Sequence, residues 1–143
     1  MSKLDIHVAV VDDDESLCRS MERLLRAAHL QPEVFASAEA FLAHDRRAEF
    51  DCLVLDIQLE GMSGLELHEA LATAGDRTPV IFITAHDAPA IHDQAWRGGC
   101  AGFFRKTEPG EHLLAAIHRA VAAHRAAPPP RPASERPASL PTS

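Results

Sequence analysis

Three nearly continuous apolar runs limit what this chain can fold into more than any other feature. They span residues 6–11, 52–55 and 79–84. Such runs are typical of buried strands that are covered on both faces, because neither face meets water. Strands of this kind occur in parallel sheets with helices packed on each side, so the runs predict an α/β protein.

Segments with helical spacing alternate with these strands. After the first run, apolar residues recur along one helix face from Leu17 to Ala28, and acidic residues open the segment, where the helix dipole favours them. Five β–α units predict a doubly wound parallel sheet in a single domain, residues 1–125. The other expected elements are strands around 32–35 and 101–104 and helices around 38–44, 65–71, 88–97 and 113–124.

Size and charge exclude several classes of protein. At 143 residues the chain is long enough for one domain with its own core. Its formal charge of −7 argues against a nucleic-acid-binding surface, which would be basic. No apolar stretch approaches the roughly 20 residues that cross a bilayer, and the N-terminus lacks signal-peptide anatomy, so we expect a cytoplasmic protein. The widely spaced cysteines are expected to be reduced core thiols: Cys18, Cys52 and Cys100.

The composition changes abruptly near the C-terminus. From Pro128 onward, the sequence is a mixture of proline, alanine, serine and arginine. Such a segment cannot supply a hydrophobic core, so residues 126–143 are expected to form a disordered or polyproline-like tail. A plain spacer is the favoured interpretation, although a proline-rich segment can also bind a groove lined by aromatic side chains.

Acidic residues stand directly after two of the predicted strands. Asp12, Asp13 and Asp14 follow the first strand, and Asp56 ends the third. The carboxyl ends of parallel strands lie at one edge of the sheet, where ligands gather. Carboxylates crowded there repel one another and are costly to desolvate, so they need a compensating charge. Because Mg²⁺ prefers carboxylate oxygens and water, these residues predict a magnesium site with Lys106 at its rim.

Four short segments together resemble the motifs of response-regulator receiver domains of two-component signalling. They are residues 10–14, 56–64, 83–86 and 103–106, and the likeness extends over nearly all of residues 6–125. Each segment alone is a weak signal, but the four in order on successive strands are a strong one. The resemblance implies a flavodoxin-like fold with five parallel strands in the order 2-1-3-4-5.

The resemblance assigns the acidic residues to phosphoryl transfer. Asp56 would be the phosphoacceptor, a nucleophilic carboxylate that takes a phosphoryl group from a phosphohistidine. Asp13 would bind Mg²⁺ directly, Asp12 would hold a metal-bound water or orient the site, and the backbone carbonyl of Gln58 would complete the protein's ligands. Without the resemblance, the acidic run would be interpreted as the charged start of a helix.

Residues that follow the other strands would complete the site. Lys106 would pair first with the phosphoacceptor and then with a phosphoryl oxygen. Thr84 would donate its hydroxyl to the phosphoryl group, and the rotamer of Phe103 would follow that movement, unless this aromatic is simply part of the core. Gln58 and His86 would flank the water that hydrolyses the acyl phosphate and so set its lifetime. His86 could instead belong to a docking surface.

Two residues depart from the family pattern. Thr107 follows Lys106 where the family usually has a proline, often after a cis peptide bond. A cis bond before another residue costs about 3 kcal/mol, so this loop is expected either to be trans and re-routed or to store strain, which puts the reach of Lys106 in question. Glu60 replaces the usual proline of the phosphoacceptor loop, which removes rigidity and adds a negative charge near the metal site.

The nine histidines form no recognisable metal motif. No pair has the HExxH pattern. His112, His118 and His124 recur every six residues, which places neighbours on opposite sides of a helix. Solvated or half-buried histidines are therefore expected.

The first functional hypothesis is a stand-alone receiver with Mg²⁺ as its cofactor. It would take its phosphoryl group from a histidine kinase or a phosphotransfer protein and would not be a turnover enzyme. Residues 37–42 and 62–67 resemble the subgroup that usually carries a helix-turn-helix output domain, which is not expected in this chain. The signal would therefore pass to a downstream protein by contact, without direct binding to nucleic acid or membrane.

Two other functions are weighed against this one. An interaction module could keep the fold and signal without phosphate, as Thr107 and Glu60 suggest. A metal-dependent phosphatase is a poorer choice, because it needs a general acid two residues after Asp56, and that residue is Gln58.

Overall fold

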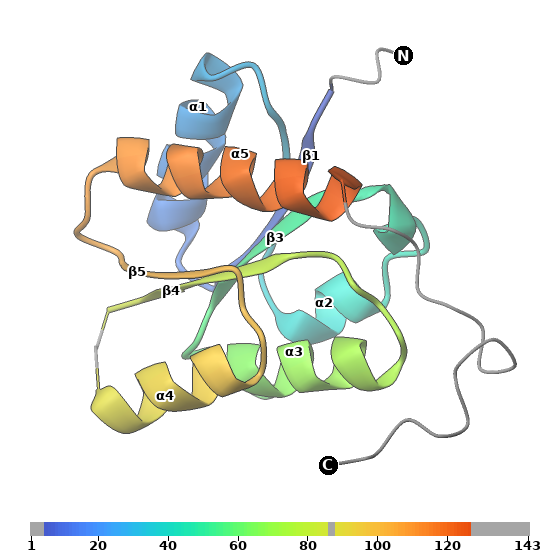
Figure 1. The fold of residues 1–143 in the computed structure, drawn as a ribbon. Coiled ribbons are helices and arrows are strands. Elements are labelled where there is room, and N and C mark those ends of the chain that lie inside the picture. Colours follow the sequence, from blue (N-terminus) through green and yellow to red (C-terminus); the bar gives the residue numbers. More distant parts are fainter. Residues whose placement is uncertain (1–4, 86–87, 127–143) are drawn as a thin grey trace, which may run out of the picture.

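Five parallel strands form one sheet in the computed structural model of the chain, which describes residues 5–85 and 88–126. The strands are β1 (His7–Val11), β2 (Gln31–Phe35), β3 (Cys52–Asp56), β4 (Val80–Thr84) and β5 (Gly102–Arg105). Their order is β2-β1-β3-β4-β5, and every neighbouring pair is parallel (Figure 1). The predicted fold class and strand order are confirmed.

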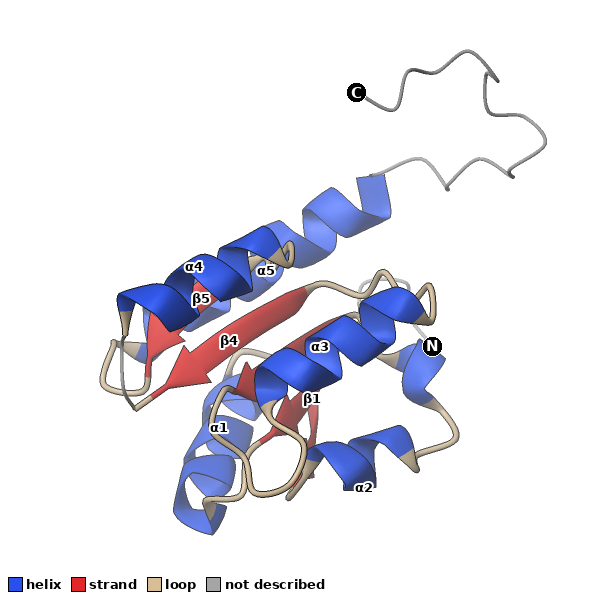
Figure 2. Ribbon diagram, turned by 90° about the horizontal axis from the view of Figure 1, so that it is seen from below, coloured by secondary structure: helices blue, strands red, loops and turns tan. Residues whose placement is uncertain are grey.

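Helices cover both faces of this sheet. The helical segments are α1 (Glu15–Ala27), α2 (Ala38–Leu42), a 3-10 turn (Arg47–Glu49), α3 (Gly64–Thr73), α4 (Pro89–Arg97) and α5 (Gly110–Ala126). Figures 1 and 2 show α1 and α5 on one face and α2, α3 and α4 on the other. The side chains of Asp14, Ser37 and Ser63 accept backbone N–H groups in the first turns of α1, α2 and α3, which fixes where each helix begins.

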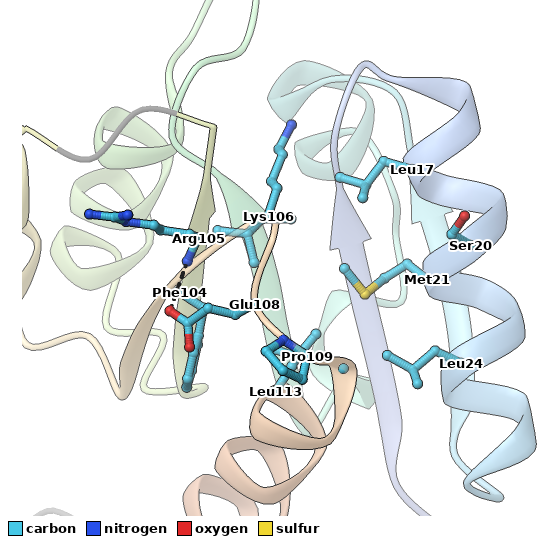
Figure 3. A pocket seen from close by; sticks show the side chains of 12 residues that line it. Leu17, Ser20, Met21, Leu24, Phe104, Arg105, Lys106, Glu108, Pro109 and Leu113 are labelled. Carbon is cyan, nitrogen blue, oxygen red and sulfur yellow. Dashed lines mark hydrogen bonds between the residues drawn. The ribbon is translucent and has the colours of Figure 1, made fainter.

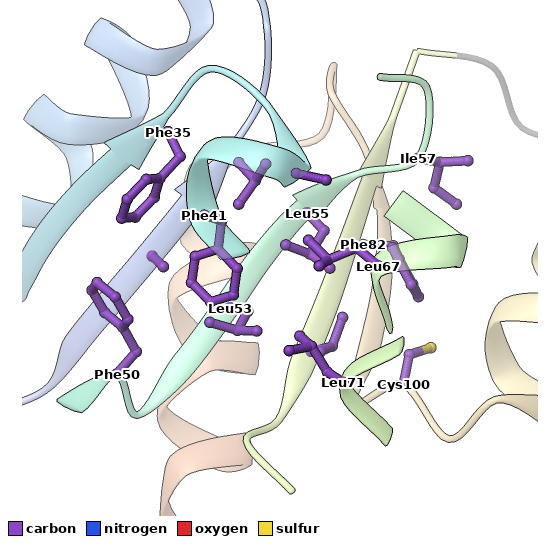
Figure 4. Close-up of a cluster of buried hydrophobic side chains, with 14 of the residues drawn as sticks. Phe35, Phe41, Phe50, Leu53, Leu55, Ile57, Leu67, Leu71, Phe82 and Cys100 are labelled. Atoms are coloured by element: carbon purple, nitrogen blue, oxygen red, sulfur yellow. The ribbon is translucent and has the colours of Figure 1, made fainter. Parts of the chain in front are cut away.

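Alternate side chains of the strands enter two hydrophobic cores. Val8 and Val10 of β1 pack with residues of α1 and α5, whereas Ala9 and Val11 pack with residues of α2 and α3. All five residues of β3 and of β4 are buried, which explains why their sequences are continuous apolar runs. Figure 4 shows the core beneath α2 and α3, where the ring of Phe41 is fully buried. These two cores hold the carboxyl ends of the strands at one edge.

The observed element boundaries differ from the expected ones by a few residues. The helix expected to reach residue 44 ends at Leu42. His112, His118 and His124 of the last helix are exposed, which agrees with the expectation of solvated histidines. The buried residues of α5 are Leu113, Ala116, Ile117 and Val121.

The cysteines are confirmed as core thiols. All three are buried and free, and burial is the main cause that raises the pKa of Cys18, Cys52 and Cys100 to about 11, 12 and 11 respectively. They therefore remain protonated near neutral pH. Apart from Ala126, the predicted tail lies outside the described residues. Within those residues, no helix combines the length and the apolar character that crossing a bilayer requires.

Candidate metal centre

Three aspartates from two neighbouring strands meet at the carboxyl edge of the sheet. Asp12 directly follows β1 and is 1% exposed, and Asp56 is the last residue of β3 and is 3% exposed. Asp13 is exposed. One carboxylate oxygen from each lies within 4.8 Å of the others, and this is the only such group of acidic, histidine or cysteine side chains among the described residues. The predicted acidic cluster is present, because β1 and β3 pair in register and end together.

Lys106 bridges the two buried aspartates. Its Nζ lies 2.9 Å from Oδ2 of Asp12 and 3.0 Å from Oδ2 of Asp56. Its backbone N–H donates to the carbonyl of Thr84 over 2.9 Å, which ties the lysine to the end of β4. Figure 3 shows the side chain extending from the end of β5 toward the end of β1.

The residue after Lys106 does not prevent this reach. All described peptide bonds are trans, so the bond before Thr107 takes the trans form of the two that the sequence left open. The loop then turns into α5 through Glu108, whose carboxylate accepts the backbone N–H of Arg105 over 3.3 Å. Proline at position 107 is therefore not required for Lys106 to reach the acidic edge, which is formed by Asp12, Asp13 and Asp56.

The buried charges of Asp12 and Lys106 shift each other's pKa. Burial is the main cause that raises the pKa of Asp12, and the backbone N–H of Asp14 and the ammonium of Lys106 only partly offset it. For Lys106, desolvation alone would lower the pKa, but the hydrogen bonds and charges of Asp12 and Asp56 outweigh it and raise the pKa. Lys106 therefore stays protonated, while the negative charge of the Asp12 carboxylate is only partly neutralised.

The donor atoms suit a hard divalent cation. Oδ1 of Asp12 accepts the backbone N–H of Asp14 over 2.9 Å. Its Oδ2 is buried and, among the described residues, has only the ion pair with Lys106 and no hydrogen bond of good geometry. Asp12 and Asp56 thus share one ammonium, and a bound cation would neutralise the remaining negative charge. Three carboxylates around one point are the donors that Mg²⁺ favours.

The loop that follows Asp56 is folded tightly against it. The backbone N–H of Gln58 donates to Oδ1 of Asp56 over 3.1 Å, so the backbone of this predicted ligand residue stands next to the carboxylate. At the other end of the loop, Ser63 and Glu66 form a capping box that starts α3. Gly64 N–H donates to the carbonyl of the residue after Asp56 over 3.1 Å, which closes the loop on itself.

Of the remaining predicted residues, two lie at or near the carboxyl ends of β4 and β5. Thr84 is fully buried at the end of β4, beside the backbone of Lys106. Phe103 lies on β5, partly buried against the core beneath α2 and α3, and its ring centroid is 4.8 Å from that of His92 in an edge-to-face contact. His86 lies outside the described residues.

Two contacts near the site were not foreseen from the sequence. Glu39 of α2 accepts the backbone N–H of Met62 over 3.0 Å, across 23 residues of sequence. On α4, His92 joins Phe103 to the exposed Trp96, because Nε1–H of Trp96 donates to Nε2 of His92 over 3.1 Å. No motif marks either contact, since each depends on how α2 or α4 docks on the sheet.

Replacing Lys106 by methionine should lower stability in metal-free buffer by about 2 kcal/mol, because two buried carboxylates lose their counter-ion. The pKa of Lys106 is raised, so its contribution is complete below pH 10.5, the ordinary lysine value, and is lost only as pH rises through the raised value. Urea denaturation should therefore give the same deficit at about pH 8 and about pH 9. Arg119→Met, an exposed cation on α5, serves as the control. An unchanged K106M midpoint would contradict the bridging role.

The chain is similar in sequence to known proteins of one family. A sequence model described as the response regulator receiver domain matches residues 8–118. The response regulator protein TodT of Pseudomonas putida is 34% identical over 114 residues, which cover 80% of this chain and 50% of TodT. The transcriptional regulatory protein TdiR of Thauera aromatica is 36% identical over 118 residues, covering 82% of this chain and 52% of TdiR. The chain thus spans about half the length of these curated relatives.

Solved structures agree in fold. The crystal structure of FixJ-N is similar with a TM-score of 0.77 and 31% identity, and the match covers 85% of this chain and 96% of that one. The response regulator StyR is similar with a TM-score of 0.78 and 39% identity, and the match covers 85% of this chain and 62% of StyR.

Proposed function

The chain belongs to the response-regulator receiver domain family, and from this premise we propose that Asp56 accepts a phosphoryl group from a phosphohistidine in a reaction that requires Mg²⁺. Members of this family are signalling modules of two-component systems. The phosphoryl group on Asp56 would be a signal that is made and later hydrolysed, and not an intermediate in the turnover of a small substrate.

The side chains of the acidic edge divide this chemistry among them. A carboxylate oxygen of Asp56 attacks the phosphorus and the P–N bond to the donor imidazole breaks. The imidazole, protonated on its other nitrogen, leaves as a neutral ring with the bonding electron pair. The ammonium of Lys106 stands beside that carboxylate and can follow the negative charge onto a phosphoryl oxygen. Asp12, Asp13, Asp56 and the backbone carbonyl of Gln58 would hold Mg²⁺, which supplies neutralisation of the phosphoryl charge.

One observation carries the proposal: Lys106 bridges two buried carboxylates, and the carboxylate of Asp13 lies within reach of both. Buried carboxylates that serve only the fold are normally fully hydrogen-bonded or paired. Here Asp12 and Asp56 carry two negative charges against one lysine, and Asp13 adds a third carboxylate at the rim. The arrangement is suited to an incoming cation and to an anionic group that the cation and the lysine share.

The supporting roles proposed from the sequence concern four residues. Thr84 would donate its hydroxyl to a phosphoryl oxygen, because it is buried at the strand end next to Lys106. Phe103 would follow that movement, and its contact with His92 would pass the change to α4. Gln58, which is exposed beside the phosphoacceptor, would help to set the lifetime of the acyl phosphate, together with His86.

The proposed partners follow from this chemistry. A histidine kinase or a phosphotransfer protein would supply the phosphoryl group, and a downstream protein would read the phosphorylated surface by contact. The net charge of −7 speaks against direct contact of this domain with nucleic acid. A cytoplasmic location stays a prediction from the sequence.

The alternative is an interaction module that works without phosphate. Of the two residues that suggested it, Thr107 no longer favours it. Lys106 reaches both aspartates with a trans bond at that position. Glu60 remains, an exposed carboxylate in the phosphoacceptor loop whose charge would oppose an anionic donor.

The proposal is tested by mixing the protein with a small phosphoramidate and following intact mass, with either Mg²⁺ or a chelator present. One phosphoryl group should be added with Mg²⁺ and none with the chelator, because the crowded carboxylates otherwise repel the donor. Protein that stays unmodified in Mg²⁺ would favour the phosphate-independent module. Equal labelling in the chelator would refute the metal requirement.

A further inference from the structure

Helix α2 is tied to the loop that follows the phosphoacceptor. The carboxylate of Glu39, in the first turn of α2, accepts the backbone N–H of Met62 over 3.0 Å. The same carboxylate lies against Gly61, where a Cβ atom would stand only 2.7 Å from Oε2 of Glu39. Gly61 also has a φ of 75°, a left-handed conformation that glycine adopts at no steric cost. The loop is therefore shaped around this glutamate.

The contact lies where the loop has least rigidity of its own. One end of the loop is held by the hydrogen bond from Gln58 to Asp56, and the other by the capping box of α3. Between them stand Glu60, at a position where proline would restrict the backbone, and Gly61, the most permissive residue. A hydrogen bond from outside the loop at Met62 limits the freedom of the residues next to it.

The glutamate is charged under ordinary conditions. The backbone N–H of Met62, followed by the backbone N–H of Glu39 itself, lowers the pKa of this carboxyl. A lowered pKa means that the hydrogen bond is complete above about pH 4.5, the ordinary glutamate value, and is lost only as pH falls through the lowered value. Near neutral pH the contact is thus a charge-assisted hydrogen bond, which is stronger than a neutral one.

We propose that Glu39 is a positioning residue for phosphoryl transfer: by holding Met62 it fixes the loop whose Gln58 backbone N–H donates to the carboxylate of Asp56. The inference rests on the proposed function, because it gives the loop a task in Mg²⁺ binding. Helix α2 contributes no residue to the acidic edge, yet through Glu39 it would control the geometry of that edge. Leu59 and Met62 pack their side chains against the core, and the hydrogen bond to Glu39 adds a restraint on the backbone of the loop.

The test compares Glu39→Ala, which removes the acceptor, with Glu39→Gln, whose amide oxygen can still accept from Met62. In metal-free protein, amide hydrogen exchange at Met62 should be about tenfold faster in E39A than in wild type, with a clearly smaller increase in E39Q, whose hydrogen bond is neutral. Titration with Mg²⁺, followed by the amide shifts of Asp13 and Gln58, should show several-fold weaker binding in E39A and a smaller loss in E39Q.

Glu69→Ala is the matched control, since it removes one exposed negative charge from α3 without touching this contact. Unchanged exchange and unchanged Mg²⁺ affinity in E39A would overturn the inference, as would an equal loss in E69A, which would reduce the effect to net charge. If wild type binds no Mg²⁺, the proposed function fails, and the hydrogen exchange of Met62 still decides whether Glu39 holds the loop.

Discussion

Alanine in place of Asp56 should reduce phosphoryl transfer to the background of the donor's own hydrolysis. The side chain supplies the nucleophilic oxygen in the proposed reaction, and an alanine methyl group cannot form an acyl phosphate. Intact mass after incubation with Mg²⁺ and a small phosphoramidate should show no added phosphoryl group. Asp93→Ala, which removes an exposed carboxylate from α4, should be labelled like wild type. Label on the alanine variant at wild-type level would place the acceptor elsewhere.

Asparagine at the same position separates the loss of chemistry from the loss of fold. The repulsion from Asp56 is one of the causes that raise the pKa of Asp12, after burial, and the amide removes that repulsion while keeping the shape. Lys106 then pairs with Asp12 alone. Asp56→Asn should therefore be inactive as an acceptor yet at least as stable as wild type in metal-free buffer, as measured by urea denaturation. A strongly destabilised asparagine variant would show that the carboxylate serves the fold.

The architecture could be predicted because the burial of a strand determines its pattern of apolar residues. β3 and β4 are buried at every position, and their sequences are unbroken apolar runs. The carboxyl ends of parallel strands meet at one edge, so the closeness of Asp12 and Asp56 followed from the fold class alone. The same reasoning placed Lys106 at this edge, at the end of β5.

Contacts that depend on how loops and helices pack against the sheet produce no such pattern in the sequence. The sequence left open whether Lys106 could reach the site past Thr107, because the course of a short loop depends on its backbone angles. The hydrogen bond from the backbone N–H of Met62 to Glu39 joins a partly buried residue to an exposed one, and no periodicity or motif relates positions so far apart. The contact between His92 and Phe103 depends in the same way on how α4 lies against β5.

The close approach of α3 to the phosphoacceptor gives the second large expected effect. A Cβ atom on Gly64 would stand 2.1 Å from the carbonyl oxygen of Asp56, 2.9 Å from its carbonyl carbon and 3.1 Å from the Cα of Ile57. All three neighbours are backbone atoms, so no side chain can turn aside to relieve the clash. The start of α3 or the end of β3 must move, and β3 ends in the phosphoacceptor Asp56.

Gly64→Ala should therefore cost about 3 kcal/mol of stability, at the upper end of what overpacking a buried position usually costs, in urea denaturation followed by circular dichroism. Gly98→Ala is the matched control, because its Cβ would meet only ordinary contacts at 3.5 Å and its φ of −73° suits alanine. That variant should stay within about 0.5 kcal/mol of wild type. In the folded fraction of G64A, displacement of the Asp56 backbone should also weaken Mg²⁺ binding. Equal stability of the two alanine variants would mean that β3 and α3 can separate without cost, and the loop would then not be held as tightly as the proposed phosphoacceptor requires.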